Sequence, residues 1–516
     1  MRLRLLAAFI CLQFASCLLA QYRPLALRNP GFEAVANGAV ADWSSPSYWS
    51  GELTSISDPA LVHGGKRAAQ LKAVTKGDRT WGRILNTVLV AQVGLDYRFS
   101  VFARGTGKLK LGVINYVPEE PGKTPYEYAW QEQPTVLTDQ WQEVVYTFTP
   151  VSYVVERIAP VIEIEGEQAV ALLDDADIQV ARQAEGRIVA SPYAMARVGA
   201  TVSADWQVER EGKPAALPVL VVTRTTAGAT TQEQRSDDQG RLHLEIKAPD
   251  APELVSVVVV QRDLGATATV YVDAVPEAVY NEFAAAAKAA RIGARPQHWL
   301  FLGDSLTDFS RGYNYVDQVC YWLKSFNEGQ PTYRNAGVGG DYITRSLDRL
   351  NGKAGTWRLE MYDNLYEPKP TRVFMMLGHN DSKLSSTSGF TEPVVKPEDY
   401  KAQFAEFIGK VKEKTGGAPF TLLSPTSSVY EITKANADKA VAAGRGASLF
   451  GKPEVMEQYT KLTQEVAAAT GGDFIDVFTP TRDFPNKPTL FTGDGVHLSL
   501  EGNHLVALEM LKHLGK

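Results

Sequence analysis

The pattern of apolar and polar positions divides the chain into regions of different periodicity. In residues 22–181, apolar and polar positions alternate in short runs such as residues 97–102 and 144–148, separated by Gly, Pro and Asp. A period of two interrupted by turn residues is typical of half-buried β-strands. The first region is therefore predicted to be an all-β domain.

A second β-rich region follows at residues 185–274. Residues 217–222 and 254–260 are strongly apolar and β-branched, and residues 237–240 have the composition of a hairpin turn. The spacing of these runs predicts an immunoglobulin-like β-sandwich. No residue in this region has an evident chemical role, so we expect it to act as a spacer.

From residue 298 onward the periodicity changes to short apolar runs that alternate with amphipathic helices. An Ala-rich helical pattern at residues 276–290 precedes this change and predicts a linker helix within residues 275–297. Strands are expected at residues 299–302, before Asn335, and at 373–377, 421–423 and 474–477; helices are expected, among others, at 400–413 and 453–469. This alternation predicts an α/β domain over residues 298–516, with a parallel sheet of about five strands covered on both faces.

Residues 1–20 have the features of a secretory signal peptide. Arg2 and Arg4 precede an almost wholly apolar stretch, and the bond between Ala20 and Gln21 is a plausible cleavage point. The stretch is short for a membrane span. A secreted or periplasmic protein is therefore expected, with lipoprotein anchoring through Cys17 as the alternative.

Charge and cysteine content narrow the possibilities further. A net charge of -6 without a basic stripe argues against nucleic acid as a partner. Of the three cysteines, Cys11 and Cys17 lie in the predicted signal peptide. Cys320 lies in an apolar helical pattern, where a packed core thiol is expected.

Four short motifs in the last region carry the candidate chemistry. Each lies where polar groups can gather at the carboxyl edge of a parallel sheet. The motifs are GDSL at residues 303–306, GGD at 339–341, GHND at 378–381 and DGVH at 494–497.

Together the four motifs supply what hydrolysis of an ester requires. Ser305 is a candidate nucleophile, His497 can remove its proton, and Asp494 can orient the imidazole. The backbone N–H groups of Ser305 and Gly340 and the side-chain amide of Asn380 are candidate donors to the oxyanion of a tetrahedral intermediate.

In these motifs the chain resembles the SGNH (GDSL) hydrolase superfamily over about residues 298–514. The resemblance implies a catalytic triad of Ser305, Asp494 and His497, an oxyanion hole of Ser305, Gly340 and Asn380, and no cofactor. His379 departs from the family pattern, which usually has a small residue there; it is expected either to contact substrate or to line the pocket wall. Residues 427–451 resemble a mobile flap over the site. The remaining histidines lack metal-ligand spacing, so no catalytic metal is expected.

The first region resembles the jelly-roll carbohydrate-binding modules of secreted glycan-active enzymes, on the motif NPGFE at residues 29–33, on Trp43 and on residues 172–178. Such modules bind sugars on aromatic side chains. Tyr126, Tyr128 and Trp130, in a stretch that reads as loop-like, are the best candidates, and core or edge packing is the alternative. Asp174 and Asp175 could hold a structural calcium ion, as in similar modules, or form a solvated turn.

These observations predict a secreted serine esterase that removes acyl groups, with acetyl expected, from a polysaccharide or oligosaccharide through an acyl-enzyme. A lipolytic esterase or lysophospholipase is the first alternative, because the same triad would serve it. A catalytically inactive glycan-binding surface protein is the second. Fold alone does not decide among them.

Overall fold

The computed structural model describes residues 21–516, so the predicted signal peptide lies outside it. Gaps in the description fall at residues 26, 37–38, 47–48, 87, 92–95, 117–125, 150–156, 183–185, 262–263, 265, 294–295, 309–312, 328–330 and 354–355. The described chain forms two compact units. One holds residues up to 190 with 203–245 and 255–270, and the other holds residues 191–202, 246–254 and 271–516.

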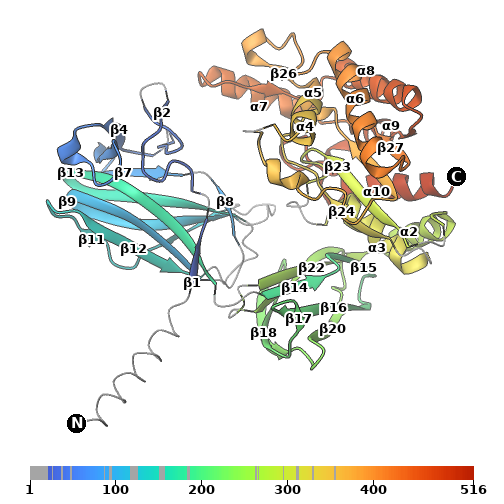
Figure 1. Ribbon diagram of the computed structural model, residues 1–516, viewed down its shortest axis with the longest axis horizontal. Helices are drawn as coiled ribbons and strands as arrows, with labels where there is room; N and C mark the ends of the chain where they lie inside the picture. Colours follow the sequence, from blue (N-terminus) through green and yellow to red (C-terminus); the bar gives the residue numbers. More distant parts are fainter. Residues whose placement is uncertain are drawn as a thin grey trace. The chain divides into compact units, whose positions relative to one another are not determined.

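A five-stranded sheet is the framework of the second unit (Figure 1). Its order is β24-β23-β25-β27-β29, and every neighbouring pair is parallel. The strands are β23 (His298–Gly303), β24 (Thr332–Asn335), β25 (Arg372–Met376), β27 (Phe420–Leu423) and β29 (Asp473–Ile475). The predicted parallel sheet is thus confirmed, within a few residues at the strand ends.

Helices cover both faces of this sheet, because successive side chains of a strand point to opposite sides. Trp299 and Phe301 pack into a core shared with α2 (Glu277–Ala289), α3 (Tyr315–Phe326) and α10 (Leu500–Leu514). Leu300 and Leu302 pack into a second core shared with α4 (Ile343–Leu350), α6 (Pro397–Thr415) and α8 (Pro453–Ala469). Burial on both faces explains why the β23 sequence is a continuous apolar run.

Side-chain caps fix the starts of two helices. The side chain of Asn314 accepts hydrogen bonds from Val316 and Asp317 N–H and forms a capping box at the start of α3. Ser499 accepts a hydrogen bond from Gly502 N–H at the start of α10. The remaining elements of this part of the chain are η3 (Leu359–Tyr362), α5 (His379–Ser382), β26 (Leu384–Ser385), η4 (Ser386–Ser388), α7 (Tyr430–Ala442), β28 (Ser448–Leu449), α9 (Phe478–Arg482) and η5 (Lys487–Leu490).

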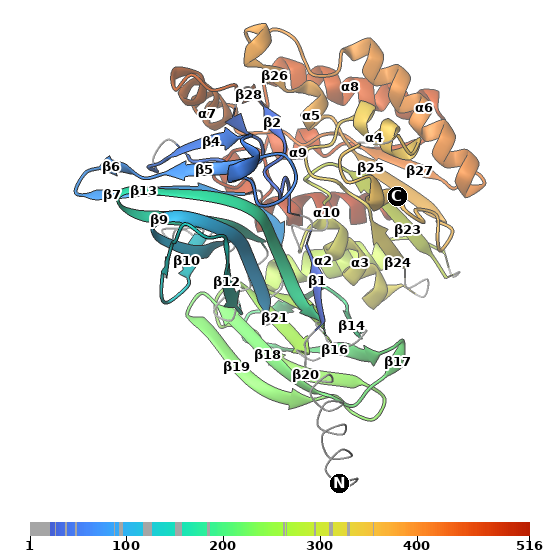
Figure 2. The same ribbon diagram turned by 60° about the vertical axis from the view of Figure 1, so that its left-hand side comes forward.

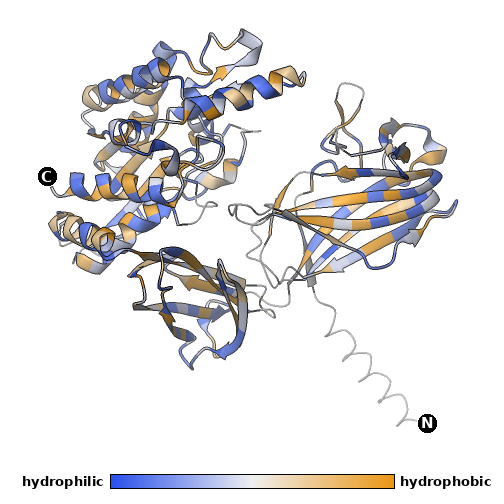
Figure 3. Ribbon diagram, turned by 180° about the vertical axis from the view of Figure 1, so that it is seen from behind, coloured by the Kyte–Doolittle hydropathy of each residue, from blue (hydrophilic) through white to orange (hydrophobic). Residues whose placement is uncertain are grey.

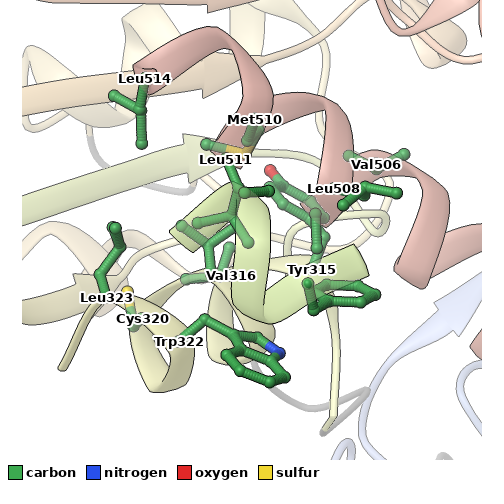
Figure 4. Close-up of a cluster of buried hydrophobic side chains, with 14 of the residues drawn as sticks. Tyr315, Val316, Cys320, Trp322, Leu323, Val506, Leu508, Met510, Leu511 and Leu514 are labelled. Atoms are coloured by element: carbon green, nitrogen blue, oxygen red, sulfur yellow. The ribbon is translucent and has the colours of Figure 1, made fainter. Parts of the chain in front are cut away.

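The helix expected as a linker is α2, and it belongs to the core of the second unit. Phe283 and Ala287 of α2 are buried in the cluster that contains α3 and α10. Figure 4 shows the packing of α3 against α10, with Cys320 among the apolar side chains. Cys320 is buried and free, as expected for a core thiol, and burial raises its pKa well above the ordinary value.

The N-terminal region is confirmed as all-β, and it is organised around two long strands. β9 (Tyr97–Tyr116) and β13 (Arg157–Arg182) run antiparallel side by side (Figure 2). Their register shifts between Glu165 and Val170, and the two halves of each strand acquire different neighbours. The others are β1 (Gln21–Pro24), β2 (Val35–Ala36), β3 (Ala39–Val40), β4 (Glu52–Ile56), η1 (Pro59–Leu61), β5 (Ala68–Lys72), β6 (Val74–Lys76), β7 (Arg79–Leu85), β8 (Leu89–Val90), β10 (Tyr126–Trp130), β11 (Thr135–Val136) and β12 (Gln142–Phe148).

The core of this region lies between the two halves of the long strands. Residues 97–103 pair with β12 and residues 112–116 pair with β10, so the sheet folds over on itself as a sandwich. Phe99 and Val101 from the first half share one buried cluster with Leu109 and Leu111 from the second. Figure 3 shows the resulting alternation of hydrophobic and hydrophilic residues along the strands.

The second β-rich region is confirmed as strands in two sheets. One contains β14 (Gly186–Ala190), β16 (Thr201–Arg210), β17 (Lys213–Pro214) and β20 (Arg241–Lys247). The other has the order β15-β22-β21-β18-β19, from β15 (Tyr193–Arg197), β18 (Pro218–Thr225), β19 (Gly228–Arg235), β21 (Glu253–Gln261) and β22 (Ala266–Val275). Buried Trp206 of β16 donates a hydrogen bond to Ala268 O of β22, which joins the two sheets.

Candidate active site

The candidate catalytic groups follow the first three strands of the parallel sheet. Ser305 follows β23, Gly340 follows β24 and Asn380 follows β25, and these strands are adjacent, with β23 in the middle. Carboxyl ends of parallel strands meet at one edge of the sheet, where the chain reverses its order of strands. The topology therefore brings the first three motifs together.

The fourth motif, in the segment between η5 and α10, completes a hydrogen-bonded chain. His497 Nε2 lies 2.9 Å from Ser305 Oγ, and His497 Nδ1 contacts Asp494 Oδ2. Asp494 can only accept at this contact, so Nδ1 carries a proton and Nε2 is left to accept the Ser305 hydroxyl proton. This is the geometry of a nucleophile, a base and an orienting carboxylate.

Asp494 is held in its ionised form. Its Oδ1 accepts hydrogen bonds from Val496 N–H at 2.8 Å and from His497 N–H at 2.9 Å. Burial alone would raise the pKa of Asp494, but the hydrogen bond from the His497 ring and these N–H groups hold it well below the ordinary value. A carboxylate that stays charged can stabilise the imidazolium that forms when His497 takes a proton.

The motifs also contain the three candidate hydrogen-bond donors for an oxyanion. Within the described residues, the backbone N–H groups of Ser305 and Gly340 donate no hydrogen bond. Gly340 has a φ of 80°, a conformation that favours glycine. Asn380 Nδ2 is 3.4 Å from Asp304 Oδ2, a long contact, and Asn380 Oδ1 accepts a hydrogen bond from Lys383. The three predicted donors thus keep hydrogen-bonding capacity for a ligand.

Aspartates within or near the motifs, namely Asp308, Asp341 and Asp381, brace the loops. Asp308 accepts a hydrogen bond from Gly339 N–H at 2.7 Å and forms an ion pair with Arg358. Asp381 accepts a hydrogen bond from Ile343 N–H at 2.8 Å and so caps α4 from a neighbouring segment. Asp341 pairs with Arg349 in a fully buried ion pair. These contacts fix the loop that presents Gly340.

Asp304 lies under the site and is almost completely buried. Its Oδ1 accepts a hydrogen bond from Leu306 N–H at 2.9 Å, which shapes the turn that exposes Ser305. Burial raises the pKa of Asp304 to about 6, and burial likewise raises the pKa of Asp381 to about 7. Both carboxyls therefore carry less negative charge near neutral pH than a solvated aspartate.

His379 is buried, and the two roles named for it from the sequence, contact with substrate or lining of the pocket wall, stay predictions. Its Nε2 lies 2.9 Å from Thr426 Oγ1, and the Thr426 hydroxyl donates to Ser427 O. Thr426 therefore accepts, and His379 carries its proton on Nε2. Burial lowers the pKa of His379 to about 3, so the ring is neutral at physiological pH.

The segment expected to act as a flap contains regular structure. Residues 427–451 include α7 and strand β28, and β28 pairs antiparallel with β26. Val429 N–H donates to Gly495 O at 2.8 Å, which joins the start of this segment to the motif of Asp494 and His497.

The aromatic candidates for sugar binding lie on a strand, so the loop-like interpretation of this stretch was wrong. Residues 126–130 form β10, which pairs antiparallel with β9. Tyr128 and Trp130 are two positions apart and stack with ring planes 4° apart and centroids separated by 5.9 Å. The Tyr126 side chain lies outside the described residues. Hydrogen bonding to β9 makes this segment a strand, although its composition is typical of a loop.

The proposed calcium ligands Asp174 and Asp175 are engaged by nitrogen donors. Asp174 Oδ2 accepts hydrogen bonds from His63 and Gly64 N–H, each at 3.0 Å, and Asp174 Oδ1 accepts one from Asp175 N–H. Asp175 contacts the His63 ring. Over the described ranges, no group of three His, Cys, Asp or Glu side chains could hold a metal ion. The residues as placed do not fit a calcium site.

Two cations beside the oxyanion donors were missed from the sequence. Arg345 Nη1 donates a hydrogen bond to Gly340 O at 3.2 Å, and Lys383 Nζ donates one to Asn380 Oδ1 at 3.2 Å. Both residues lie a few positions after a motif, which was the only available signal.

In the described part of the chain, no helix is long and apolar enough to cross a membrane.

Comparisons with known proteins find similarities for the C-terminal part of the chain. The model of the GDSL-like Lipase/Acylhydrolase family matches residues 301–505, whereas no curated protein matches the chain. Among solved structures, the chain is similar to a lipase/acylhydrolase from Enterococcus faecalis at 21% identity, over 42% of this chain and 95% of that chain, with a TM-score of 0.31.

The N-terminal region has its own structural similarities. One is to the CBM22-1 xylan-binding domain from Paenibacillus barcinonensis Xyn10C at 16% identity, over 29% of this chain and 91% of that chain, with a TM-score of 0.23. Another is to TmCBM61 in complex with β-1,4-galactotriose at 18% identity, over 30% of this chain and 97% of that chain, with a TM-score of 0.21.

The family match and the geometry fall on the same residues. The matched segment contains Ser305, Gly340, Asn380, Asp494 and His497, and it runs from β23 into α10. Residues 301–505 therefore match the GDSL-like lipase/acylhydrolase family model, and this match supports an ester hydrolase.

Proposed function

We propose that this protein is a secreted serine esterase that removes acetyl groups from a polysaccharide. The observation that carries the proposal is the hydrogen-bonded chain from Ser305 Oγ to His497 Nε2, at 2.9 Å, and from His497 Nδ1 to Asp494. Ser305, Asp494 and His497 are assigned as the triad, and Ser305 N–H, Gly340 N–H and Asn380 Nδ2 as the oxyanion donors.

The reaction proceeds through an acyl-enzyme. Ser305 Oγ attacks the ester carbonyl carbon while His497 Nε2 takes the hydroxyl proton, and the donors stabilise the negative oxygen. His497 then gives this proton to the departing sugar oxygen as the C–O bond breaks. In the second half, water attacks the acyl carbon with His497 as base, and acetate and the Ser305 hydroxyl are released.

The N-terminal sandwich supports a polysaccharide over a soluble small ester. Trp130 packs on the backbone of Gly112, because a Cβ at that position would lie 2.3 Å from Trp130 Cε3. The ring lies against the sheet, and the Arg83 guanidinium lies 5.0 Å from its centroid and 5.2 Å from that of Tyr128. Tyr128, which is 36% exposed, stacks beside it. We assign this pair as the sugar-stacking surface, with Tyr126 on the same strand as a further candidate.

The proposed function is tested by acetate release from a panel of acetylated polysaccharides, with Ser305→Ala as the blank. Release from a polymer by the native protein, absent with the variant, is the expected result. Ser305-dependent cleavage of long-chain acyl esters without acetate release would favour the lipolytic alternative. No Ser305-dependent hydrolysis of any ester would favour the inactive glycan-binding alternative.

Secretion is a separate part of the proposal, and it rests on residues 1–20. N-terminal sequencing of the protein recovered outside the cytoplasm should give a chain that begins at Gln21. A chain that retains residues 1–20, or one that begins at a lipid-modified Cys17, would contradict cleavage after Ala20.

Replacing Trp130 with alanine should selectively weaken action on insoluble glycan. Loss of one stacking ring at a binding surface is expected to lower affinity about tenfold. The measurement is the turnover of an insoluble acetylated polysaccharide divided by that of p-nitrophenyl acetate. Trp141→Ala is the matched control, because Trp141 contacts His63 and Arg104 instead of the Tyr128–Trp130 pair. An equal ratio in both variants would remove the binding role from Trp130.

A further inference from the structure

Two cations flank the oxyanion donors, and their hydrogen bonds define where they lie. Arg345 is bonded to the carbonyl of Gly340, and Lys383 is bonded to the side-chain oxygen of Asn380. Since Gly340 and Asn380 are both assigned to the oxyanion hole, both cations stand beside the position of the ester carbonyl. Both are half-buried, so they keep some access to a ligand.

Neither cation has an acidic partner among the described residues. Other arginines of the same region are neutralised: Arg349 pairs with Asp341 and Arg358 with Asp308. By contrast, the contacts of Arg345 are with the Gly340 carbonyl and the Tyr342 ring. Those of Lys383 are the Asn380 side chain and the Phe450 ring. Among the described residues, the arrangement leaves both positive charges without an ion-pair partner.

The surroundings of Lys383 raise the free-energy cost of keeping a positive charge there. Burial, followed by the charge of Arg345, lowers the pKa of Lys383 below its ordinary value, while Asp381 and Asp304 act in the opposite direction. Those two carboxyls are buried and bonded to backbone N–H groups, so they are not ion-pair partners of Lys383. A partly desolvated cation without a partner destabilises the fold, and a bound anion would remove that cost.

We propose that Arg345 and Lys383 bind the carboxylate of a uronate residue in the polysaccharide whose ester is cleaved. The inference rests on the proposed function and narrows its substrate to acylated acidic glycans. A uronate ring carries a carboxylate and acylated hydroxyls on the same or an adjacent sugar. One substrate can therefore place an anion beside both cations while its ester carbonyl enters the oxyanion hole. Arginine is suited to this role because its planar guanidinium matches a carboxylate.

The test compares acetylated polygalacturonate with acetylated xylan, which lacks a charged backbone. The native protein should have the higher kcat/KM on the polygalacturonate. Arg345→Gln and Lys383→Gln should each reduce that preference at least about tenfold, mainly through KM, because a charged partner has been removed. NaCl at about 1 M, where the Debye length is about 3 Å, should reduce the native preference and leave the variants less affected.

Matched variants separate an effect of the lost charge from an effect on folding. Arg345→Lys retains the positive charge and should keep more of the preference than Arg345→Gln. Lys414→Gln removes an exposed lysine at the end of α6 and should leave kcat/KM on both polymers unchanged.

Two results would overturn the proposal. Equal loss on both polymers would show that the cations serve only the oxyanion donors, and equal native activity on both would show no recognition of the carboxylate. The proposed function itself fails differently: neither polymer would release acetate, while p-nitrophenyl acetate would still be cleaved.

Discussion

Ser305→Ala is expected to reduce kcat by about 10⁶-fold, the scale seen when a serine nucleophile is removed. The alanine variant has no oxygen to form the acyl-enzyme, and His497 loses the group whose proton it accepts. The donors of Ser305 N–H, Gly340 and Asn380 remain, so slow hydrolysis by water can persist. Initial rates with p-nitrophenyl acetate, followed by acetate release from polymer, measure the loss.

The fold should survive this substitution. Ser305 Oγ is hydrogen-bonded to His497, and the adjacent Asp304 fixes the turn through Leu306 N–H. Thermal unfolding monitored by circular dichroism should give a transition temperature close to that of the native protein. A well-folded Ser305→Ala protein with undiminished turnover would refute the assignment of the nucleophile.

Asp494→Asn is expected to reduce kcat by about 10⁴-fold. The carboxylate accepts the proton on His497 Nδ1 and thereby leaves Nε2 free to act as the base. An asparagine amide can donate to Nδ1, which would place the ring proton on Nε2 and direct it at Ser305. The nucleophile would then have no base. The measurement is kcat on p-nitrophenyl acetate at neutral pH.

A matched control for this change is Asp483→Asn, which alters an exposed aspartate paired with Arg482. It should leave kcat unchanged. The pH profile adds a second check. Because the pKa of Asp494 lies well below its ordinary value, Asp494 stays ionised as the pH falls through the usual carboxyl range. Protonation of Asp494 should therefore not be the cause of any loss of activity at acidic pH. A native-like kcat for Asp494→Asn would contradict the assignment of Asp494 to the triad.

The parallel sheet was predictable because its signal is local. The run at residues 299–302 is apolar at every position, as a strand buried on both faces requires. In the structure, Trp299 and Leu300 accordingly enter two different cores. The four motifs could also be recognised in the sequence, since each places chemically related residues at a strand end or a turn. Their order along the chain was enough to name candidates for the nucleophile, the base and the donors.

Local signals failed where a neighbouring segment decided the structure. Residues 126–130 have the composition of a loop, but hydrogen bonding to the edge of β9 makes them a strand. The helix at 277–289 has the pattern of a linker, but Phe283 and Ala287 find an apolar surface on α3 and α10. In both cases packing against a distant part of the chain outweighed intrinsic propensity.

By itself, the sequence determined the classes of the regions, the strands of the parallel sheet and the candidate residues for ester hydrolysis. These depend on periodicity and residue chemistry, which are properties of short segments. The tertiary structure alone decided that Ser305 meets His497, 192 residues away, and that Arg345 and Lys383, which follow different motifs, come close enough for their charges to interact. Such contacts depend on strand order and helix packing, because only these bring together groups that no sequence spacing relates.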